Sequence, residues 1–583
     1  MHKNYVQNLL RISLILTVVL FLSSKIYAQT DYIELYDKQT HFIDRMDIKL
    51  RGDSVLQFTT VKPFDRKRIT ERIEKIDSLD KEGMLTDVLT DTDRYNIRSL
   101  LMNNSDWTAN YHDSFKTRKP ILKHFFKTPA HLYAVDKREQ YSLIIDPLMN
   151  VHFGKASGTN TFVNQRGIRI RGQVDRRFGF YLYLNDNQER DPLYVRDYTA
   201  AHRALPNKGY YKYYGDNADG FDYFDIRGGL TFHAGRYVDF QIGHDRFFIG
   251  NGYRTTFLSD FSAPYPFLKL NAQAGKFKYT AAITQTIAPY PNSARNKDST
   301  LPRNYMMFHY LSWQPTNWLN VGFYENTMYN SKINGGMQVG YFNPVMFNRA
   351  YSSHHGNSAK SSIGLDFKAN FAKHYQVYGQ WLINEFHASK FLKNNSPWVN
   401  KFGWQIGGKY TDAFTIKNLD LQVESNFIRP FTYMDKWAQN NFLHYNQPLA
   451  HPLGANFKEF IGILKYQPIP KLYLDAKLIF YNKGLDSASY SYKTAYYSPN
   501  NGGDLFRNYN DYREADEGYK IGHGVSNKTL IGSFTASYEI IQNLFFDVNA
   551  TIRKANVQGL EEQQTKWISA GLRWNMARRE FLW

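Results

Sequence analysis

Two stretches of this sequence mix aromatic rings with planar polar side chains. They span residues 250–260 and 429–451, and the side chains concerned are Asn251, Tyr253, Arg254, Asp260, Arg429, Tyr433, Trp437, His444, Tyr445, Asn446 and His451. Aromatic faces stack on the apolar C–H patches of sugars, and planar amide, carboxylate and guanidinium groups hydrogen-bond to hydroxyls in fixed geometry. These residue types therefore predict a polysaccharide-binding site. The alternative is that the same groups only lock folded loops through buried hydrogen bonds.

Signatures of catalysis are poor in this sequence. Neither an HExxH nor a G-x-S-x-G motif occurs, and the turn at Gly250-Asn251-Gly252 has no third glycine at position 255, so it is no dinucleotide-binding fingerprint. We therefore predict no enzyme activity, no catalytic residue, no metal and no cofactor. A hydrolase site hidden at the rim of the fold is kept as the weakest alternative.

The elements that must position these stretches alternate strictly between apolar and polar residues. In 417–428, Leu419, Leu421, Val423 and Phe427 share one face, and Asp420, Gln422, Glu424 and Asn426 share the other. Similar patterns occupy 166–174, 471–482 and 543–554. Segments of about ten residues are long enough to cross a bilayer as tilted strands, whereas strands of soluble proteins average nearer five or six residues.

Short and long links between these segments alternate regularly. The short links are 175–179, 234–237, 274–276, 314–318, 372–374, 413–417, 467–471 and 540–543; the long links are 186–224, 245–264, 287–304, 327–359, 386–400, 429–455, 482–528 and 555–564. Outer-membrane barrels have short periplasmic turns and long outer loops. With a first strand near 142–153 and a last near 565–575, we predict an all-β transmembrane outer-membrane β-barrel of about eighteen antiparallel strands.

The start of the chain predicts export. Lys3 and Arg11 precede the apolar run 12–24, and Ala28 stands at a cleavage position, as in a secretory signal peptide. We assign residues 1–28 to this signal, and export together with the predicted barrel places the protein in the cell outer membrane.

Residues 29–140 do not follow the strand pattern. Ile69, Ile73 and Ile76 lie on one helical stripe, and Thr90 and Asp93 have the spacing of a capping box. We predict a small helical domain before the barrel, which takes up residues 141–583. This domain is either a periplasmic appendage or a plug across the lower mouth of the barrel.

The loop at 245–264 carries many large aromatic side chains. Such a loop would expose a costly apolar patch if it stood in water. We therefore expect it to fold inward and to close or narrow the pore.

The overall charge and composition restrict the partners. The chain has 44 Tyr, 42 Phe and 10 Trp, and a formal net charge of +19. Aromatic girdles are typical of membrane barrels, and basic surfaces attract polyanions. For an exported barrel, outer-membrane lipid or acidic polysaccharide is a better partner than nucleic acid.

Four passages resemble a known family. They are GNGYRTTFLSDFSAPYP (250–266), GYFNPVMFNRAYSSHHGNSAKSSIGLDFKANF (340–371), RPFTYMDKWAQNNFLHYNQPLAHPLGANFKE (429–459) and NGGDLFRNYNDYREADEGYKIGHG (501–524). Together they resemble the Wzi-like capsule-assembly outer-membrane family, and more closely its Bacteroidetes branch, which includes the gliding-motility protein RemB. The chain departs from the family at 352–355, where Ser-Ser-His-His replaces an acidic run.

The resemblance implies an eighteen-stranded outer-membrane barrel with a helical plug. It implies lectin-like association with surface polysaccharide, no enzymatic activity, and a role at the moving cell surface with other surface or motility proteins as partners. The alternative from a different class is a passive or gated channel for small solutes.

Overall fold

A computed structural model describes residues 31–583 apart from 112–113, 138–139, 176–177, 216, 236, 291–299, 333–335, 344–346, 355, 357–358, 393–394 and 488–497. The predicted signal peptide at 1–28 lies outside the described residues. Among the described residues, no helix is both long enough and apolar enough to cross a bilayer.

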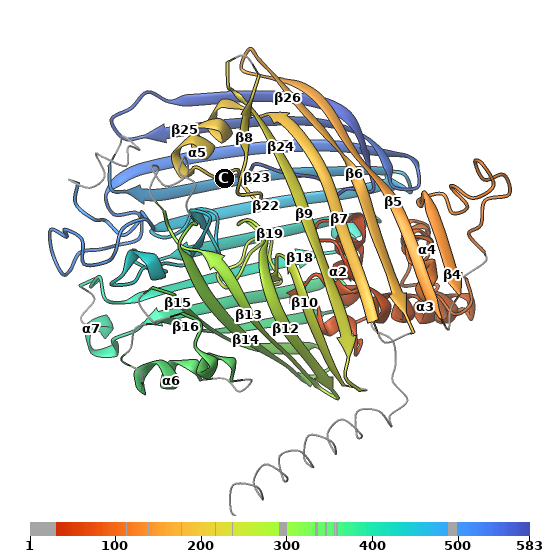
Figure 1. Cartoon of the computed structure of the whole chain (residues 1–583), viewed down its shortest axis with the longest axis horizontal. Helices are drawn as coiled ribbons and strands as arrows, with labels where there is room; N and C mark the ends of the chain where they lie inside the picture. Colours follow the sequence, from red (N-terminus) through yellow and green to blue (C-terminus); the bar gives the residue numbers. More distant parts are fainter. Residues whose placement is uncertain are drawn as a thin grey trace, which may run out of the picture.

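The main body is a closed antiparallel β-barrel of eighteen strands (Figure 1). The first and last wall strands close the ring, with Met149 opposite Trp574 and Ala156 opposite Trp567. The fold class and the strand count expected from the sequence are confirmed. The wall strands are β5 Tyr141–Ala156, β6 Thr159–Val174, β7 Phe178–Arg190, β9 Gly220–His233, β10 Val238–Asp245, β12 Tyr265–Ala274, β13 Phe277–Ile287, β14 Arg303–Thr316, β15 Leu319–Asn330, β16 Lys360–Phe371, β17 Tyr375–Glu385, β18 Lys401–Tyr410, β19 Leu419–Ile428, β22 Phe457–Ile469, β23 Leu472–Leu485, β24 Val525–Ile541, β25 Leu544–Val557 and β26 Gln563–Trp574.

The wall turns its apolar face outward. On β19, Val423 is 63% exposed, whereas Glu424 and Asn426 are buried and face the lumen. The same alternation exposes Ile242 on β10 and Leu478 on β23. An apolar exterior around a polar lumen is the arrangement of a barrel whose surroundings are lipid.

The links differ at the two ends of the barrel. At one end the strands join through short turns, such as the one between Ile469 of β22 and Leu472 of β23. At the other end the links are long, and β23 ends at Leu485 while β24 begins only at Val525. We call the first the short-turn end and the second the outer end, because long loops face outward in such barrels.

Residues 31–111 form the helical plug, which is built around α2 Lys38–Lys49, α3 Arg66–Lys81 and α4 Asp91–Asn103. Ile69, Ile73 and Ile76 are buried in its core together with residues of α2 and α4. The capping box is present, because Thr90 and Asp93 exchange side-chain-to-backbone hydrogen bonds at the start of α4.

The plug lies in the mouth of the barrel at the short-turn end. Charged pairs join it to strands spaced around the whole circumference: Asp106 to Arg171 of β6 (2.8 Å), Glu34 to Arg227 of β9 (2.7 Å), Asp47 to Lys368 of β16 (2.7 Å), Asp44 to Lys409 of β18 (3.1 Å) and Lys38 to Glu539 of β24 (2.5 Å). An appendage would touch one side only, so this geometry is that of a plug.

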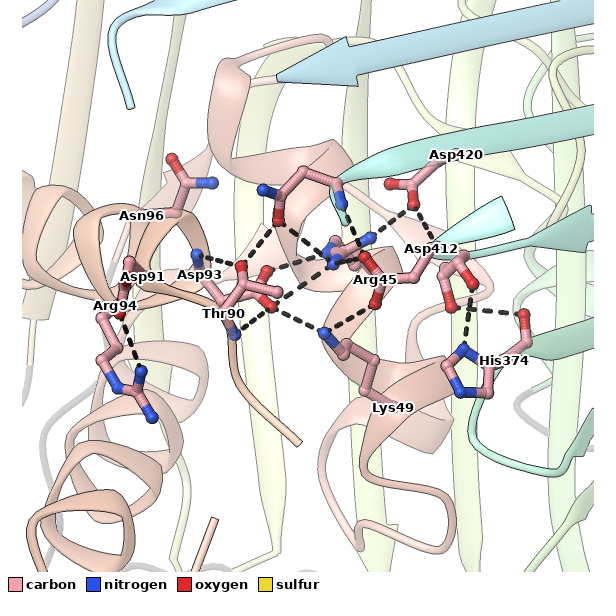
Figure 2. Close-up of polar contacts among 12 residues, drawn as sticks. Arg45, Lys49, Thr90, Asp91, Asp93, Arg94, Asn96, His374, Asp412 and Asp420 are labelled. Atoms are coloured by element: carbon pink, nitrogen blue, oxygen red, sulfur yellow. Dashed lines mark hydrogen bonds and ion pairs between the residues drawn. The ribbon is translucent and has the colours of Figure 1, made fainter. Parts of the chain in front are cut away.

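One network of charges anchors α2 to the wall (Figure 2). The Arg45 guanidinium contacts Asp93 of α4 (2.8 Å), Asp412 in the β18–β19 turn (2.6 Å) and Asp420 of β19. Lys49 contacts Asp93 (2.7 Å) and Asp412 (2.9 Å). Burial alone would raise the pKa of Asp93, but Arg45 and Lys49 outweigh it and lower that pKa to about 2.

Inward-folded segments close the outer end. We call residues 193–211, 246–264 and 429–456 the lid; it includes α5 Leu193–His202 and the short strands β11 Phe248–Ile249, β20 Leu443–His444 and β21 Gln447–Pro448. β11 pairs with β2 Val61–Lys62 of the plug, so the lid reaches the plug inside the lumen. The remaining short strands and α-helices are β1 Tyr32–Ile33, β3 Phe64–Asp65, β4 Tyr133–Lys137, β8 Lys212–Tyr214, α6 Asn348–His354 and α7 Ala388–Leu392.

The last residues of the chain also enter the lumen. After β26, the tail 575–583 turns inward, and Phe581, Leu582 and Trp583 are buried in the same apolar cluster as the lid. The Tyr194 hydroxyl of the lid donates to the carbonyl of Phe581 at 2.7 Å. The tail therefore joins the lid to the end of the wall.

Candidate functional site

The lid is organised around an aromatic core. Phe257 stacks on Tyr324 of the wall, with ring centres 4.6 Å apart and planes 6° apart. Phe247 packs edge-on against Phe267 at 4.7 Å, and Phe261 packs against Trp583 at 5.2 Å. The loop at 246–264 thus folds inward, as its aromatic content indicates.

The predicted residues of 250–260 bond to the lumen, the plug and the tail. Glu424 of β19 accepts the backbone N–H groups of Tyr253 (2.7 Å) and Arg254 (3.0 Å). The Tyr253 hydroxyl donates to Glu580 of the tail at 3.0 Å, and the Arg254 guanidinium donates to the carbonyl of Leu582.

Asn251 and Asp260 from the same stretch bind the plug. The Asn251 side-chain oxygen accepts from the Thr60 hydroxyl at 3.1 Å. Asp260 accepts from the Tyr36 hydroxyl at 3.0 Å. Burial raises the pKa of Asp260.

Arg429 and Tyr433 tie loops together. The Arg429 guanidinium donates to the carbonyls of Asn400 (2.7 Å), Pro397 (3.0 Å) and Tyr519 (3.3 Å). The buried Tyr433 donates its hydroxyl proton to the carbonyl of Thr256 at 2.7 Å. These bonds join the loop that begins at Arg429 to three other loops, which contain Thr256, Asn400 and Tyr519.

Residues 443–448 form a two-residue hairpin. Tyr445 and Asn446 occupy its turn with φ of 50° and 55°, the left-handed pair that a tight hairpin turn of this kind requires. The Asn446 amide accepts from the N–H of Tyr290 (3.1 Å) and donates to the carbonyl of His202 (3.1 Å). The ring of Tyr445 packs edge-on against Tyr290.

The two histidines of this stretch are buried. His444 Nδ1 accepts from the N–H of Ile287 (2.8 Å), and Nε2 lies 3.1 Å from the carbonyl of Pro264. Burial lowers the pKa of His444 to about 4, which matches a neutral ring that accepts at one nitrogen and donates at the other. His451 lies 2.8 Å from Glu459 of β22.

The eleven predicted residues therefore separate by exposure. Asn251, Asp260, Tyr433, His444, Asn446 and His451 are buried, and Tyr253, Arg254, Arg429 and Tyr445 are half-buried. Trp437 alone among them is exposed, at 48%. The contacts of the other ten hold the lid in shape, and binding of polysaccharide by any of the eleven stays a prediction.

Trp437 belongs to a partly exposed cluster that the sequence did not reveal: Trp437 and Tyr512 are exposed, and Trp398, Tyr509 and Arg513 are half-buried. We define the outer patch as Trp398, Trp437, Tyr509, Tyr512 and Arg513. The Arg513 guanidinium lies 3.9 Å from the centre of the Trp398 ring, and Tyr509 lies 5.2 Å from it. The backbone N–H of Tyr509 donates to the carbonyl of Asp435 at 3.1 Å, which brings Tyr509 close to Trp437. The Tyr-rich composition of 501–524 was the available signal, but no periodicity placed these residues beside Trp398.

A chamber of about 370 Å³ lies in the lumen between the plug and the lid. Tyr253, Arg254 and Asp260 line it, together with α2 and the tail. Among its lining side chains, Lys and Arg outnumber Asp and Glu by thirteen to nine. In the described part of the chain, no group of three His, Asp or Glu side chains is placed to hold a metal ion.

A closed wall with an apolar exterior, a plug and a lid define the class: an outer-membrane β-barrel with an occluded lumen. No protein-family profile matches the chain, and no curated protein sequence matches it.

Solved structures are similar in fold. One is Wzi, described as an outer-membrane protein involved in group 1 capsule assembly in Escherichia coli and as a carbohydrate-binding β-barrel. The match has a TM-score of 0.51 and 10% identity, and it covers 95% of this chain and 100% of Wzi. OprD from Pseudomonas aeruginosa matches with a TM-score of 0.39 and 11% identity over 73% of this chain and 94% of its own. At these identities the similarity to Wzi concerns the fold.

Proposed function

We propose that this protein is a non-enzymatic outer-membrane barrel that holds surface polysaccharide at the outer patch. The observation that carries the proposal is a set of aromatic and planar polar groups, with Trp437 and Tyr512 exposed, on loops that hydrogen bonds hold in one conformation. The similarity in fold to Wzi, a carbohydrate-binding barrel, supports it.

The locking contacts matter for affinity. The Asp435 carboxylate accepts the backbone N–H of Trp437 at 3.0 Å, and Asn441 accepts the backbone N–H of Asp435 at 2.6 Å. Asn441 in turn donates to the carbonyls of Leu505 (2.7 Å) and Arg507 (2.8 Å). A surface that is already ordered loses little conformational entropy when a flexible glycan binds. The ten less exposed residues of the two stretches act, in this proposal, by holding the patch in shape.

The alternatives have less support. A passive channel needs an open path, but the plug and the lid both occupy the lumen. We therefore expect purified protein to show little steady conductance in a planar bilayer. A role in motility, and partnership with motility proteins, rest on the sequence resemblance alone. The hydrolase alternative has no described cluster of side chains in its favour.

The test compares two exposed tryptophans. Trp437→Ala removes a stacking face from the outer patch, and Trp313→Ala removes a 45% exposed ring from the outside of β14 near the short-turn end. Aromatic contacts contribute about 0.5–1.5 kcal/mol, so we expect Trp437→Ala to weaken binding of purified capsular polysaccharide roughly two- to tenfold. Trp313→Ala should leave binding unchanged.

Assembly of each variant is read from heat-modifiable migration on a gel, because an intact barrel migrates differently from an unfolded chain. Wild-type binding by an assembled Trp437→Ala variant would contradict the proposed site. Arg513→Lys, which keeps the charge but loses the planar fork, should weaken binding in the same direction.

A further inference from the structure

The barrel wall has a gap on its outer half between β9 and β10. β10 pairs with β9 only from Gly228 to His233, and β8 pairs with β9 only from Gly220 to Asp222. Within the described residues, 223–227 of β9 pair with β7 on one edge and with no strand on the other. Backbone groups at such an edge are available to other partners.

A side pocket of about 350 Å³ occupies this gap. Its walls come from the unpaired edge of β9, from His244 at the end of β10, from residues 208–212 that follow α5, and from Tyr445 of the lid. Lys208 and Asp225 line both the side pocket and the chamber. The ion pair between them therefore forms a partition between the lipid-facing wall and the lumen.

The side pocket opens onto the apolar exterior. Phe224 and Ile226, which point outward on the unpaired edge, are 57% and 48% exposed. Leu230 and Ile242 continue this apolar surface toward the short-turn end. Since the gap lies near the outer ends of the strands, its mouth is at the level of the outer leaflet.

Polar and aromatic groups line the same mouth. Lys212, Tyr210 and His244 are exposed there. The two carboxylates of the pocket already have donors: Asp225 pairs with Lys208 and lies 3.5 Å from Arg227, and Asp222 accepts from Gln188 at 3.1 Å. Asp222 stands opposite Lys212 in the β8–β9 register, but among the described residues neither it nor another carboxylate forms an ion pair with the Lys212 ammonium group, which can therefore attract an anion.

We propose that the side pocket binds the phosphorylated headgroup of an outer-leaflet glycolipid, with its acyl chains lying against Phe224 and Ile226. Lys212 contacts a phosphate, and Tyr210 and Tyr445 flank the sugar. An apolar outer wall joined to a cationic recess matches an amphipathic anion, whereas a water-soluble sugar would gain nothing from Phe224 and Ile226. This site is separate from the outer patch and does not depend on the proposed function.

The first test uses native mass spectrometry of the full chain in detergent with diphosphoryl lipid A, and with the same lipid lacking its phosphates. Lys212→Glu should lower binding of the phosphorylated lipid roughly five- to tenfold. Each Lys near an anionic lipid surface raises the affinity about fivefold, and the reversed charge adds repulsion. Lys373→Glu is the matched control, because Lys373 is an exposed lysine in the β16–β17 turn at the short-turn end, away from the outer leaflet. It should change binding less than about twofold.

Equal loss in both variants, or equal binding of the dephosphorylated lipid, would overturn the proposal.

The second test determines where on the protein the lipid binds. The chain has no cysteine, so Tyr210→Cys and Tyr512→Cys each accept one benzophenone label. We expect lipid A at one equivalent to crosslink at position 210 and not at 512, which lies on the outer patch. Equal crosslinking at both positions would also overturn the proposal.

Discussion

The two ends of the barrel are closed by different kinds of contact. The plug meets the wall through buried charged pairs, such as Asp47 with Lys368 and the set around Arg45. The lid closes the outer end through a large apolar and aromatic core and through neutral hydrogen bonds, such as that from Tyr433 to the carbonyl of Thr256, to which charged contacts such as His451 with Glu459 are added. Both closures meet in the lumen, where β11 pairs with β2.

The difference follows from how each closure is made. The lid consists of loops between wall strands, so the wall positions them, and apolar burial, which has no direction, supplies much of their attachment. The plug precedes the wall strands in the chain and must find one orientation in a polar lumen. Buried charges are costly unless they are paired, so matched pairs around the circumference favour a single docked position.

The largest effect is expected from Arg45→Ala. This change leaves Asp93, Asp412 and Asp420 without their shared guanidinium, and breaking a buried ion pair costs about 3–5 kcal/mol. The plug should become sensitive to protease in a folded barrel. Cleavage within residues 31–111, followed by mass spectrometry, measures this.

Arg94→Ala serves as its control, because Arg94 is about a third exposed and pairs with Asp80 and Asp91 of the plug itself, not with the wall (Figure 2). Exposed pairs contribute about 0–1 kcal/mol, so this variant should resist protease like the wild type. If Arg45→Ala also resisted, the charged pairs would not be what holds the plug.

Acid should loosen the two closures at different pH. The folded pKa of His444 in the lid is about 4, below its ordinary 6.5. The contribution of His444 to the free energy of unfolding is therefore complete above pH 6.5. It is lost as the pH falls to 4, a change of about 3 kcal/mol. The pKa of Asp93 in the plug is about 2, below its ordinary 3.8. Its contribution of about 2 kcal/mol is lost only between pH 4 and pH 2.

Hydrogen exchange, corrected for intrinsic rates, follows both regions. Amides of 443–451 should lose protection before those of 91–103 as the pH is lowered. His444→Gln, which does not titrate, should remove the first step in part and leave the second. Simultaneous loss of protection in both regions would show that the two closures are one cooperative unit.

The smallest effect is expected from Phe257→Leu in the lid core. The change keeps most of the buried volume but loses the stacked pair with Tyr324, at a cost of less than about 1.5 kcal/mol. Hydrogen exchange of 250–260 should rise modestly while that of the plug is unchanged. Phe546→Leu, on the exposed outer face of β25, should change neither. An increase in the plug would mean that the β11–β2 pairing transmits the disturbance.

The sequence by itself determined the wall of this protein. Alternation such as Val423 beside Glu424 encodes which face of a strand meets lipid, because successive side chains of a strand point to opposite sides. The regular spacing of short and long links encoded the strand number. The helical stripe and the capping box of the plug are also local patterns, and both are present in the structure.

Only the tertiary structure decided what the polar loops do. His444 and Trp437 lie in the same stretch, and residue type alone predicts both as polysaccharide-binding residues. In the structure, His444 is buried between Ile287 and Pro264, whereas Trp437 is exposed. The outer patch joins Trp398 to Arg513, and the gap beside β9 arises because β10 is short. Irregular loops have no repeating geometry that relates spacing to direction, so their contacts depend on partners hundreds of residues away.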